Sequence, residues 1–214
     1  MDVVEGLTLV GKQRNGTSHS PGLILKPGIT PRTGNSVLFD GNTGVNFGNT
    51  HGECFGNLEL CPDGITIAAW LKIGKKSSSV DSKWYIMTSR VQDRNGPGWC
   101  WFMRHNKMRY VARNSTTMWE RIETPALPKE TWIHLMTTWH NLGGTKIYVN
   151  FKIVAKGTKV SAKNSPKGSY NFTMAIGHDP LNTAEYGNFT IDELHIWQRS
   201  VTPDMIREME RSVL

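Results

Sequence analysis

The sequence has no long apolar run and no recognisable leader, and each absence narrows the class of protein. No stretch of about 18 apolar residues occurs, so no membrane-spanning helix is predicted. The first residues, Met-Asp-Val-Val-Glu, lack the charged region and the apolar stretch of a signal peptide. Two interpretations are open, a cytosolic protein or a domain of a longer secreted chain. The features below favour the second.

The sequence also lacks the short motifs that mark several enzyme classes. It contains no Gly-x-Ser-x-Gly nucleophile elbow and no His-Glu-x-x-His zinc motif. Residues 6–12 are similar to a phosphate-binding loop, but Gln13 stands where such a loop needs Ser or Thr to hold magnesium. The seven histidines show no spacing typical of metal ligands. A non-catalytic function is therefore favoured.

Cysteine is scarce, and the three that are present do not build a disulfide framework. Cys54 and Cys61 nevertheless flank a short, turn-like segment, and closing so small a ring is expected to stabilise the fold by about 2–3 kcal/mol. Cys100 lies between Trp99 and Trp101, so alternation along a strand places it on the face opposite both rings. We expect Cys100 to be a small buried apolar residue, with a bond to another chain as the alternative.

Four sequons for N-glycosylation occur, at Asn15, Asn114, Asn171 and Asn188. Short motifs of this kind arise by chance, and one or two would carry little weight. Four of them, together with a candidate disulfide, favour an extracellular or cell-surface location.

Basic residues outnumber acidic ones, and the formal net charge is +7. They form two groups along the chain, Arg104, Lys107, Arg109 and Arg113 and then Lys152, Lys156, Lys159, Lys163 and Lys167. One interpretation is a polyanionic partner, which outside the cell means a sulfated glycosaminoglycan or a sialylated glycan and not nucleic acid. The other is a strand edge that lysines protect from pairing. The sequence favours neither of these two interpretations over the other.

Period-2 alternation dominates the chain and predicts an all-β fold. Residues 65–73 place apolar side chains at every second position, and shorter runs of the same kind, bounded by Gly, Pro, Asn and Asp, recur at 83–89, 99–104, 107–113, 118–122, 131–139, 145–150, 171–177 and 189–197. About a dozen strands without helical crossovers favour two stacked antiparallel sheets. No internal repeat occurs, so residues 1–214 are expected to form one domain.

One short helix is predicted near the C-terminus. Thr202 is suited to the N-cap, Pro203 to the first helical position, and Asp204 to the positive end of the helix dipole. Its buried stripe is expected to comprise Met205, Ile206 and Met209, so that the helix packs across one end of the sandwich.

Several motifs occur in the order found in laminin G-like and pentraxin-like domains. They are Phe39-Asp40-Gly41, Gly64 to Lys72 with Trp70, Trp132-Ile133-His134, Ile147 to Asn150, Ile191-Asp192-Glu193-Leu194 and Val201-Thr202-Pro203. Residues 37–210 thereby resemble this family, whose fold is a concanavalin A-like jelly roll. The spacing of Cys54 and Cys61 is most similar to the pentraxin-type extracellular domain of adhesion G-protein-coupled receptors. The resemblance implies a recognition domain of a larger secreted or membrane protein.

The chain departs from the family pattern at two points. Phe151 replaces the glycine that usually follows Tyr-Val-Asn, and a two-residue turn there needs positive φ at both central positions. Either the loop is longer, or backbone strain is stored in it. The aromatic-rich first strand of the family is also missing before Asp2, so the sequence is expected to begin inside the domain, leaving a sheet edge to be covered.

A calcium site is the first chemistry that the resemblance implies, because many members of the superfamily bind this ion at the rim of the sandwich. Asp40 and Asn42 lie in a Gly- and Asn-rich loop, and Asp192 is expected to point inward near a strand end. Together their oxygens are candidate calcium ligands. The alternative is that Asp192 only accepts hydrogen bonds from backbone amides of a neighbouring loop.

A ligand surface of aromatic and basic residues is the second candidate site. Its members lie on successive predicted strands and comprise Trp99, Trp101, Trp119, Tyr110, Arg104, Arg109 and Arg113. A tryptophan can stack on a sugar ring while arginine binds carboxylate or sulfate. The alternative is that most of these rings fill the core.

The sequence therefore predicts a non-catalytic extracellular recognition or adhesion domain that binds a protein or an anionic glycan. The first alternative is a calcium-dependent lectin with a specific glycan ligand. A remote alternative is a polysaccharide-active enzyme, since family 16-type glucanases share the fold. Asp192 and Glu193 are adjacent and so point to opposite faces of a strand, which prevents them from flanking one glycosidic bond.

Overall fold

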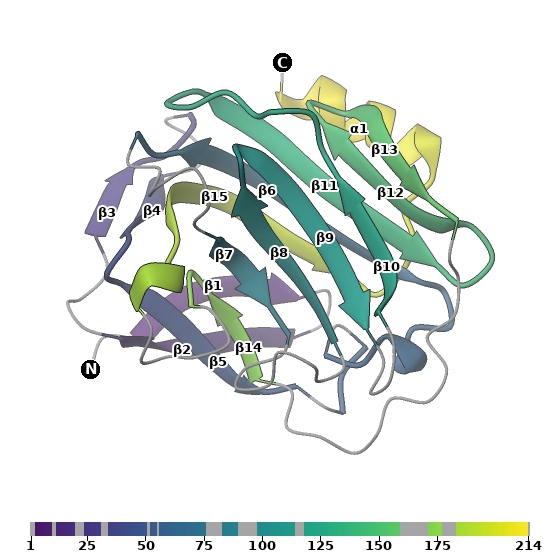
Figure 1. Ribbon diagram of the computed structural model, residues 1–214, viewed down its shortest axis with the longest axis horizontal. Coiled ribbons are helices and arrows are strands. Elements are labelled where there is room, and N and C mark those ends of the chain that lie inside the picture. The colour runs from purple at the N-terminus through teal and green to yellow at the C-terminus, as the bar shows by residue number, and fades with distance from the viewer. Residues whose placement is uncertain are drawn as a thin grey trace.

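Strands account for most of the computed structural model, which describes residues 3–9, 12–19, 24–30, 34–50, 52–54, 56–75, 83–89, 98–113, 118–158, 171–176 and 183–213 (Figure 1). In chain order the elements are β1 (Val3–Leu9), β2 (Lys12–His19), β3 (Ile24–Pro27), β4 (Asn35–Asp40), β5 (Gly44–Asn49), η2 (Leu58–Leu60), β6 (Ile65–Ile73), β7 (Trp84–Thr88), β8 (Gly98–Arg104), β9 (Lys107–Arg113), β10 (Met118–Glu123), β11 (Trp132–His140), β12 (Gly144–Val149), β13 (Lys152–Gly157), β14 (Asn171–Met174), η3 (Thr183–Glu185), β15 (Asn188–Trp197) and α1 (Pro203–Val213).

The strands form two layers that pack face to face. In the front layer the strands are paired in the spatial order β10-β9-β8-β7-β14-β5. In the back layer the order is β15-β6-β11-β12-β13, and β4 also pairs with β15 while β3 pairs with β4. Strands β2 and β1 connect the two, and β1 pairs with β15 in parallel, whereas the other strand pairs are antiparallel. The predicted antiparallel two-sheet sandwich with one C-terminal helix is confirmed.

The core lies between the layers and is built by alternation. In β6 the predicted inward residues are all buried, from Ile65 at one end to Ile73 at the other, and in β8 the inward residues include Trp99 and Trp101. Cys54 and Cys61, which form the predicted disulfide, also lie in this core. The covalent link holds the segment that leads into β6.

Cys100 lies on the outer face of the front layer, opposite the two tryptophans, as alternation predicted. It is 1% exposed and belongs to a small apolar cluster with Tyr85, Phe102 and Val111. Its thiol is buried and lies outside the Cys54–Cys61 disulfide, as expected for a small apolar residue.

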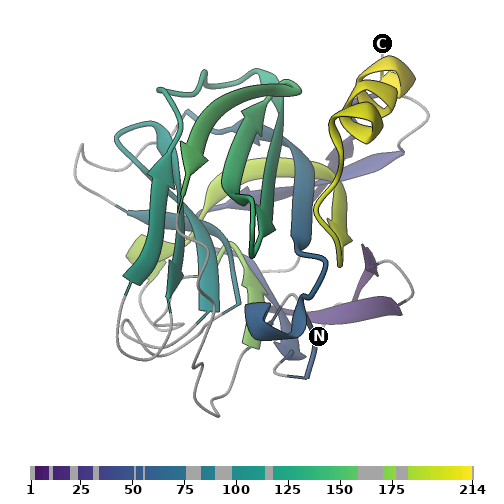
Figure 2. The same cartoon turned by 90° about the vertical axis from the view of Figure 1, so that its right-hand side faces the viewer.

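Helix α1 covers part of the outer face of the back layer (Figure 2). The hydroxyl of Thr202 accepts a hydrogen bond from the Met205 amide at 3.4 Å, which confirms the predicted cap. Met205, Ile206 and Met209 face an apolar cluster of Ala68, Met136, Tyr148 and Val201. No helix in the described part of the chain is long and apolar enough to cross a membrane.

The turn after β12 shows that backbone strain is the correct alternative for Phe151. The turn has two central residues, Asn150 with φ of 47° and Phe151 with φ of 64°. Phenylalanine is costly in this region, by about 1–2 kcal/mol relative to glycine. The turn is held by His134, whose amide donates to the Asn150 side-chain oxygen at 2.9 Å and whose ring stacks on Phe151.

Candidate functional site: a basic face on the front layer

The predicted aromatic and basic surface is divided between the two faces of the front layer. Trp99 and Trp101 are 0% exposed and Tyr110 is 1% exposed, so these rings fill the core and present no face to a ligand. The strand register explains this correction. Trp101 pairs with Tyr110, and paired residues of antiparallel strands share a face, which here is the inner one.

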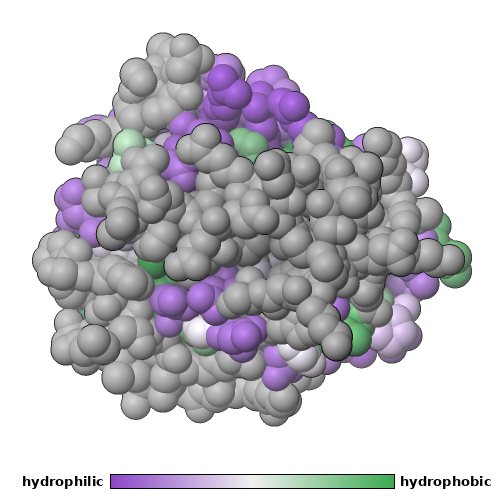
Figure 3. Space-filling model, turned by 60° about the horizontal axis from the view of Figure 1, so that its bottom comes forward, coloured by the Kyte–Doolittle hydropathy of each residue, from purple (hydrophilic) through white to green (hydrophobic). Residues whose placement is uncertain are grey.

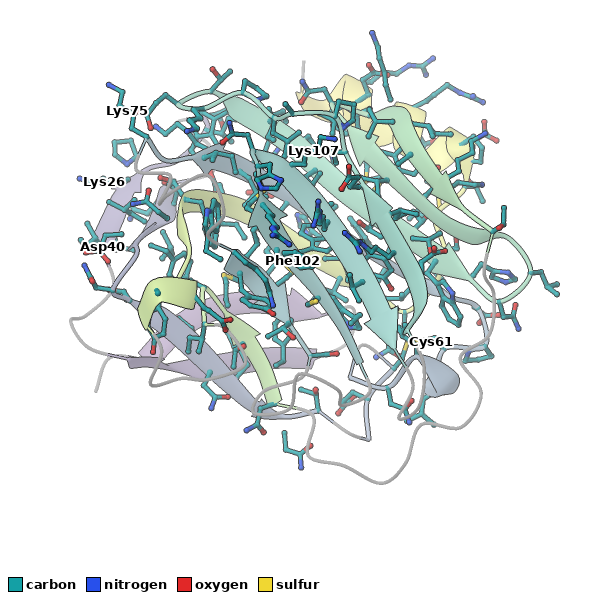
Figure 4. The ribbon with its side chains drawn as sticks, in the orientation of Figure 1. Lys26, Asp40, Cys61, Lys75, Phe102 and Lys107 are labelled. Atoms are coloured by element: carbon teal, nitrogen blue, oxygen red, sulfur yellow. A yellow bond between two sulfur atoms is a disulfide. The ribbon has the colours of Figure 1, made fainter. Side chains whose placement is uncertain are left out.

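The arginines of the predicted surface point the other way. Arg109 pairs with Phe102 and Glu123, and Arg104 pairs with Lys107, all on the outer face of β8, β9 and β10. Arg121 lies two residues before Glu123 on β10, so its exposed side chain is on the same outer face. Figure 4 shows Phe102 and Lys107 over the front layer. We call the cationic residues here the basic face: Lys83, Arg104, Lys107, Arg109 and Arg121.

Glu123 is the carboxylate that β10 adds to the basic face. It accepts hydrogen bonds from the Lys107 ammonium at 2.8 Å and from the Arg109 guanidinium at 2.9 Å. The hydrogen bond from Lys107, together with the charge and hydrogen bond of Arg109, holds the pKa of Glu123 below its usual value. Glu123 is therefore ionised at neutral pH and offsets one of the five positive charges.

Aromatic rings support the edge of the basic face. The Lys83 ammonium lies 4.6 Å from the centre of the Tyr85 ring and 5.2 Å from that of Phe102. Such a cation over an aromatic face is stabilised by the ring quadrupole. The Lys83 ammonium is thus held against the outer face of the front layer, the face on which Phe102 pairs with Arg109.

Sequence reasoning did not identify Lys83 and Arg121 as site residues. A signal for Arg121 was available, because it alternates in register with Glu123 along β10, but the pairing of β10 with β9 was not predictable. Arg113 and Trp119 lie in β9 and β10, and their side chains fall outside the described part. Of the second basic group, Lys152 and Lys156 lie on β13, a terminal strand of the sheet order, as the edge-protection interpretation predicted. Its other members, Lys159, Lys163 and Lys167, fall outside the described residues.

The three predicted calcium ligands do not come together. Asp40 pairs with Asn188, which lies four residues before Asp192 along β15, or about 13 Å at the usual rise per residue. In Figure 4, Asp40 lies at one end of the molecule. Its carboxylate accepts the amide of Asn42 at 2.9 Å in a local turn.

Asp192 has the structural role that was the alternative to metal binding. One carboxylate oxygen accepts the Ile29 amide at 2.8 Å, and the other accepts the Glu193 amide at 2.9 Å. Glu193 has a φ of 49° and lies in a β-bulge, so Asp192 both stabilises the bulge and holds the segment after β3. These three residues do not converge on one ion, and the binding of calcium by this protein stays a prediction.

The two acidic residues at this bulge have separate partners. Asp192 is 7% exposed and bonded to backbone amides, whereas the exposed Glu193 carboxylate lies 3.1 Å from the His195 ring nitrogen. They do not face each other across a space for a substrate. In the described part of the chain, no group of three His, Cys, Asp or Glu side chains is close enough to hold a metal ion.

The four sequons have different environments. Asn15 lies in β2 with its side chain outside the described part, and Asn114 falls outside the described residues. Asn171 begins β14 and is half-buried. Asn188 begins β15, where its side-chain amide donates to the Asp40 carbonyl at 3.3 Å.

The described surface seen from below is mainly hydrophilic, with small separate hydrophobic areas (Figure 3).

Comparison of the amino-acid sequence with known proteins supports this fold. A sequence-family model of laminin G-like domains, described as the Concanavalin A-like lectin/glucanases superfamily, matches residues 40–207. The human adhesion G-protein coupled receptor D1 is 28% identical over 173 residues, which cover 78% of this chain and 18% of the receptor. The chain thus spans less than a fifth of that relative's length.

Solved structures show the same fold at low identity. The binding domain of Paraclostridial Mosquitocidal Protein 1 has a TM-score of 0.72 at 12% identity, covering 98% of this chain and 51% of that one. A structure of botulinum neurotoxin type C, whose cell entry is described as dependent upon interaction with two ganglioside molecules, has a TM-score of 0.69 at 13% identity, covering 99% and 51%. At these identities the likeness is one of fold.

Proposed function

The chain belongs to the Concanavalin A-like lectin/glucanases superfamily, and we propose that it is a non-catalytic, extracellular recognition domain that binds anionic glycans. The observation that carries the proposal is the basic face, where cationic side chains from β8, β9 and β10 and from Lys83 beside β7 share one side of the sheet, and two of them, Lys107 and Arg109, pair with Glu123. A net charge of +7 adds a long-range attraction for such a partner.

The chemistry of the basic face suits sulfate and carboxylate groups. Guanidinium groups bind these anions through two parallel hydrogen bonds, and ammonium groups add charge with fewer geometric demands. Arg104, Arg109 and Arg121 come from three adjacent strands, and each is shifted by two residues along the sheet from the next, since Arg104 pairs with Lys107, Arg109 with Glu123 and Arg121 with Val111. They therefore run diagonally across the outer face. A sulfated chain lying across β8–β10 would meet several cations in turn.

The relatives support an adhesion role outside the cell. The chain matches part of an adhesion receptor, and a neurotoxin with the same fold interacts with gangliosides, which are sialylated glycolipids. The Cys54–Cys61 disulfide and the four sequons are consistent with an oxidising, secretory route. The separate partners of Asp192 and Glu193 support a function without hydrolysis.

Heparin affinity chromatography tests the proposal with two matched variants. Lys107→Gln/Arg121→Gln removes two positive charges from the basic face, and Lys152→Gln/Lys156→Gln removes two from the edge strand β13. Since net charge falls equally in both, we expect only the first variant to elute at clearly lower salt. Equal elution of the two variants would show that binding depends on net charge alone and would overturn the assignment of the site.

A further inference from the structure

A hairpin of β1 and β2 closes a gap at the edge of the sandwich. One edge of β15 pairs with β6. The other edge is shared, because β4 pairs with it up to Ile191 and β1 pairs with it at His195 and Ile196, on either side of the bulge at Glu193. On its far side the hairpin pairs through β2 with β5 of the front layer. We call β1 and β2 the arm, and it links the two layers at this edge.

The arm is held to the rest of the molecule at its two ends. Thr8 and Leu9, near the turn of the arm, pair in parallel with β15, and residues 17–19, at the other end, pair with β5. Parallel pairs are slightly less stable per residue than antiparallel ones. By contrast, β6 pairs with β11 continuously over residues 65–72. Figure 2 shows the arm at the margin of the molecule, below α1. The arm is thus attached by short stretches of pairing.

The chain is anchored again directly after the arm. Four residues, 20–23, connect the arm to β3. Strand β3 pairs with β4 over its whole length, and the Ile29 amide that follows it donates to the Asp192 carboxylate at 2.8 Å. A short connection between a lightly held element and a fixed one is the usual hinge for domain swapping, in which two copies of a chain exchange the same element.

Apolar side chains are exposed immediately beyond this hinge. Leu25 pairs with Val37, which packs against the core, so Leu25 lies on the inner side of the back layer, yet it is 60% exposed. Ile24, on the other face of β3, is 37% exposed. Single exposed apolar residues are common, but these two are adjacent and lie on an end strand. Lys26 and Pro27 disfavour the addition of a further strand there, so the apolar pair suits side-chain packing against another surface.

We propose that two copies of this chain exchange their arms, so that the arm of each copy fills the gap between β15 and β5 of the other. The partner is a second copy because the arm already fits this gap in register within one chain. Exchange forms the same backbone pairs again, so it costs little beyond association itself.

The exposed apolar pair gives the exchanged form a contact that the monomer lacks. In a two-fold dimer of this kind the two hinges lie together, which places Ile24 and Leu25 of both copies side by side. Burial of their apolar surface favours the dimer. The inference is independent of the proposed function, since it concerns the edge between the layers and not the basic face.

Cross-linking between two different single-cysteine variants of the full chain tests the exchange. Thr8 and His195 are Cα partners in the register, and adjacent strands lie about 4.8 Å apart, which suits a disulfide. Thr8→Cys protein and His195→Cys protein are mixed and unfolded in acidic urea, where thiols do not exchange. The mixture is then returned to neutral pH at high protein concentration and oxidised. Lys75→Cys replaces His195→Cys in the control, because Lys75 is exposed near Asn188 at the opposite end of β15.

We expect a disulfide-linked dimer of the Thr8→Cys and His195→Cys chains and none in the control mixture. Light scattering across a concentration series measures the dimer in the absence of cross-links. Leu25→Lys should lower the association constant tenfold or more, whereas Leu142→Lys, the same change at a residue 87% exposed between β11 and β12, should leave it unchanged.

A chain that stays monomeric at every concentration after refolding would overturn the proposal. So would a dimer in which Thr8→Cys and His195→Cys chains do not cross-link, because the copies would then associate by another surface. Equal association constants for Leu25→Lys and Leu142→Lys would overturn the contact at the hinge.

Discussion

The ring of Phe151 stacks on the imidazole of His134, with 4.2 Å between ring centres and 15° between ring planes. This contact couples a strained turn to the centre of the back layer, since Phe151 has positive φ and His134 lies in β11 between β6 and β12. The first two predictions follow from this pair.

Replacing Phe151 by Gly or by Ala separates backbone strain from ring packing. Both changes remove the stacked ring, but only glycine accepts a φ of 64° without cost. Phe151→Gly should therefore be more stable than Phe151→Ala by about 1 kcal/mol. Urea unfolding of the two variants measures the difference, and equal stabilities would show that the turn is not strained.

His134 should make stability fall in mild acid. Its pKa is about 4 in the folded protein and near 6.5 when unfolded, so the unfolded state binds the additional proton between these values. The contribution is fully present above pH 6.5 and is lost as the pH falls toward 4, by up to about 3 kcal/mol. Unfolding of wild type and His134→Gln across this range measures it. Parallel pH profiles would contradict the burial of a neutral imidazole.

Glu123 should weaken anionic ligands, because it neutralises part of the basic face. Glu123→Gln is expected to raise heparin affinity several-fold, whereas Glu208→Gln, with the same charge change on exposed α1, should have little effect. Since Glu123 is partly exposed, its ion pairs stabilise the fold by less than about 1 kcal/mol. Calorimetric titration with heparin measures the affinities of the wild type and the two variants. An unchanged affinity in Glu123→Gln would contradict the prediction.

Asp192 should stabilise the protein without calcium. Asp192→Asn retains the size of the side chain but loses the negative charge that two backbone amides share, at a cost of about 1–3 kcal/mol. The loss of melting temperature should be the same in calcium and in a chelator. A wild-type melting temperature that rises with millimolar calcium, with the rise abolished in Asp192→Asn, would restore the metal site.

Asn188 should carry less glycan than Asn171 in secreted protein. The Asn188 amide donates to the Asp40 carbonyl, and its side chain lies directly against Gly74, so a sugar there would obstruct the pairing of β15 with β4. Asn171 begins β14 opposite the exposed Asn49. Mass spectrometry of glycopeptides measures both sites. Full occupancy at Asn188 in folded protein would contradict this contact.

The sequence predicted the features that local chemistry decides. Alternation in residues 65–73 predicted the core strand β6, the spacing of Cys54 and Cys61 predicted the disulfide, and Thr202 with Pro203 predicted the start of α1. Each depends on neighbours within a few positions. Alternation predicted two stacked antiparallel sheets, the family resemblance predicted the jelly roll, and the family match over residues 40–207 confirms the family.

The candidate site was only half predictable, because it depends on pairing between distant strands. Local sequence placed Trp101 and Arg109 on neighbouring strands, but only the register shows that they face opposite sides of the layer. Likewise, the separation of Asp40 from Asp192 follows from the pairing of β4 with β15, which brings together residues about 150 positions apart. Long-range register is what a single sequence does not reveal.

The position of bound heparin tests the basic face most directly. Lysines of the protein are labelled with an amine-reactive reagent, with and without a short heparin oligosaccharide, and quantified by mass spectrometry. The account predicts that Lys107 is protected by the ligand, while the exposed Lys26, Lys75 and Lys152 are labelled equally in both samples. Protection of Lys152 with full labelling of Lys107 would contradict it.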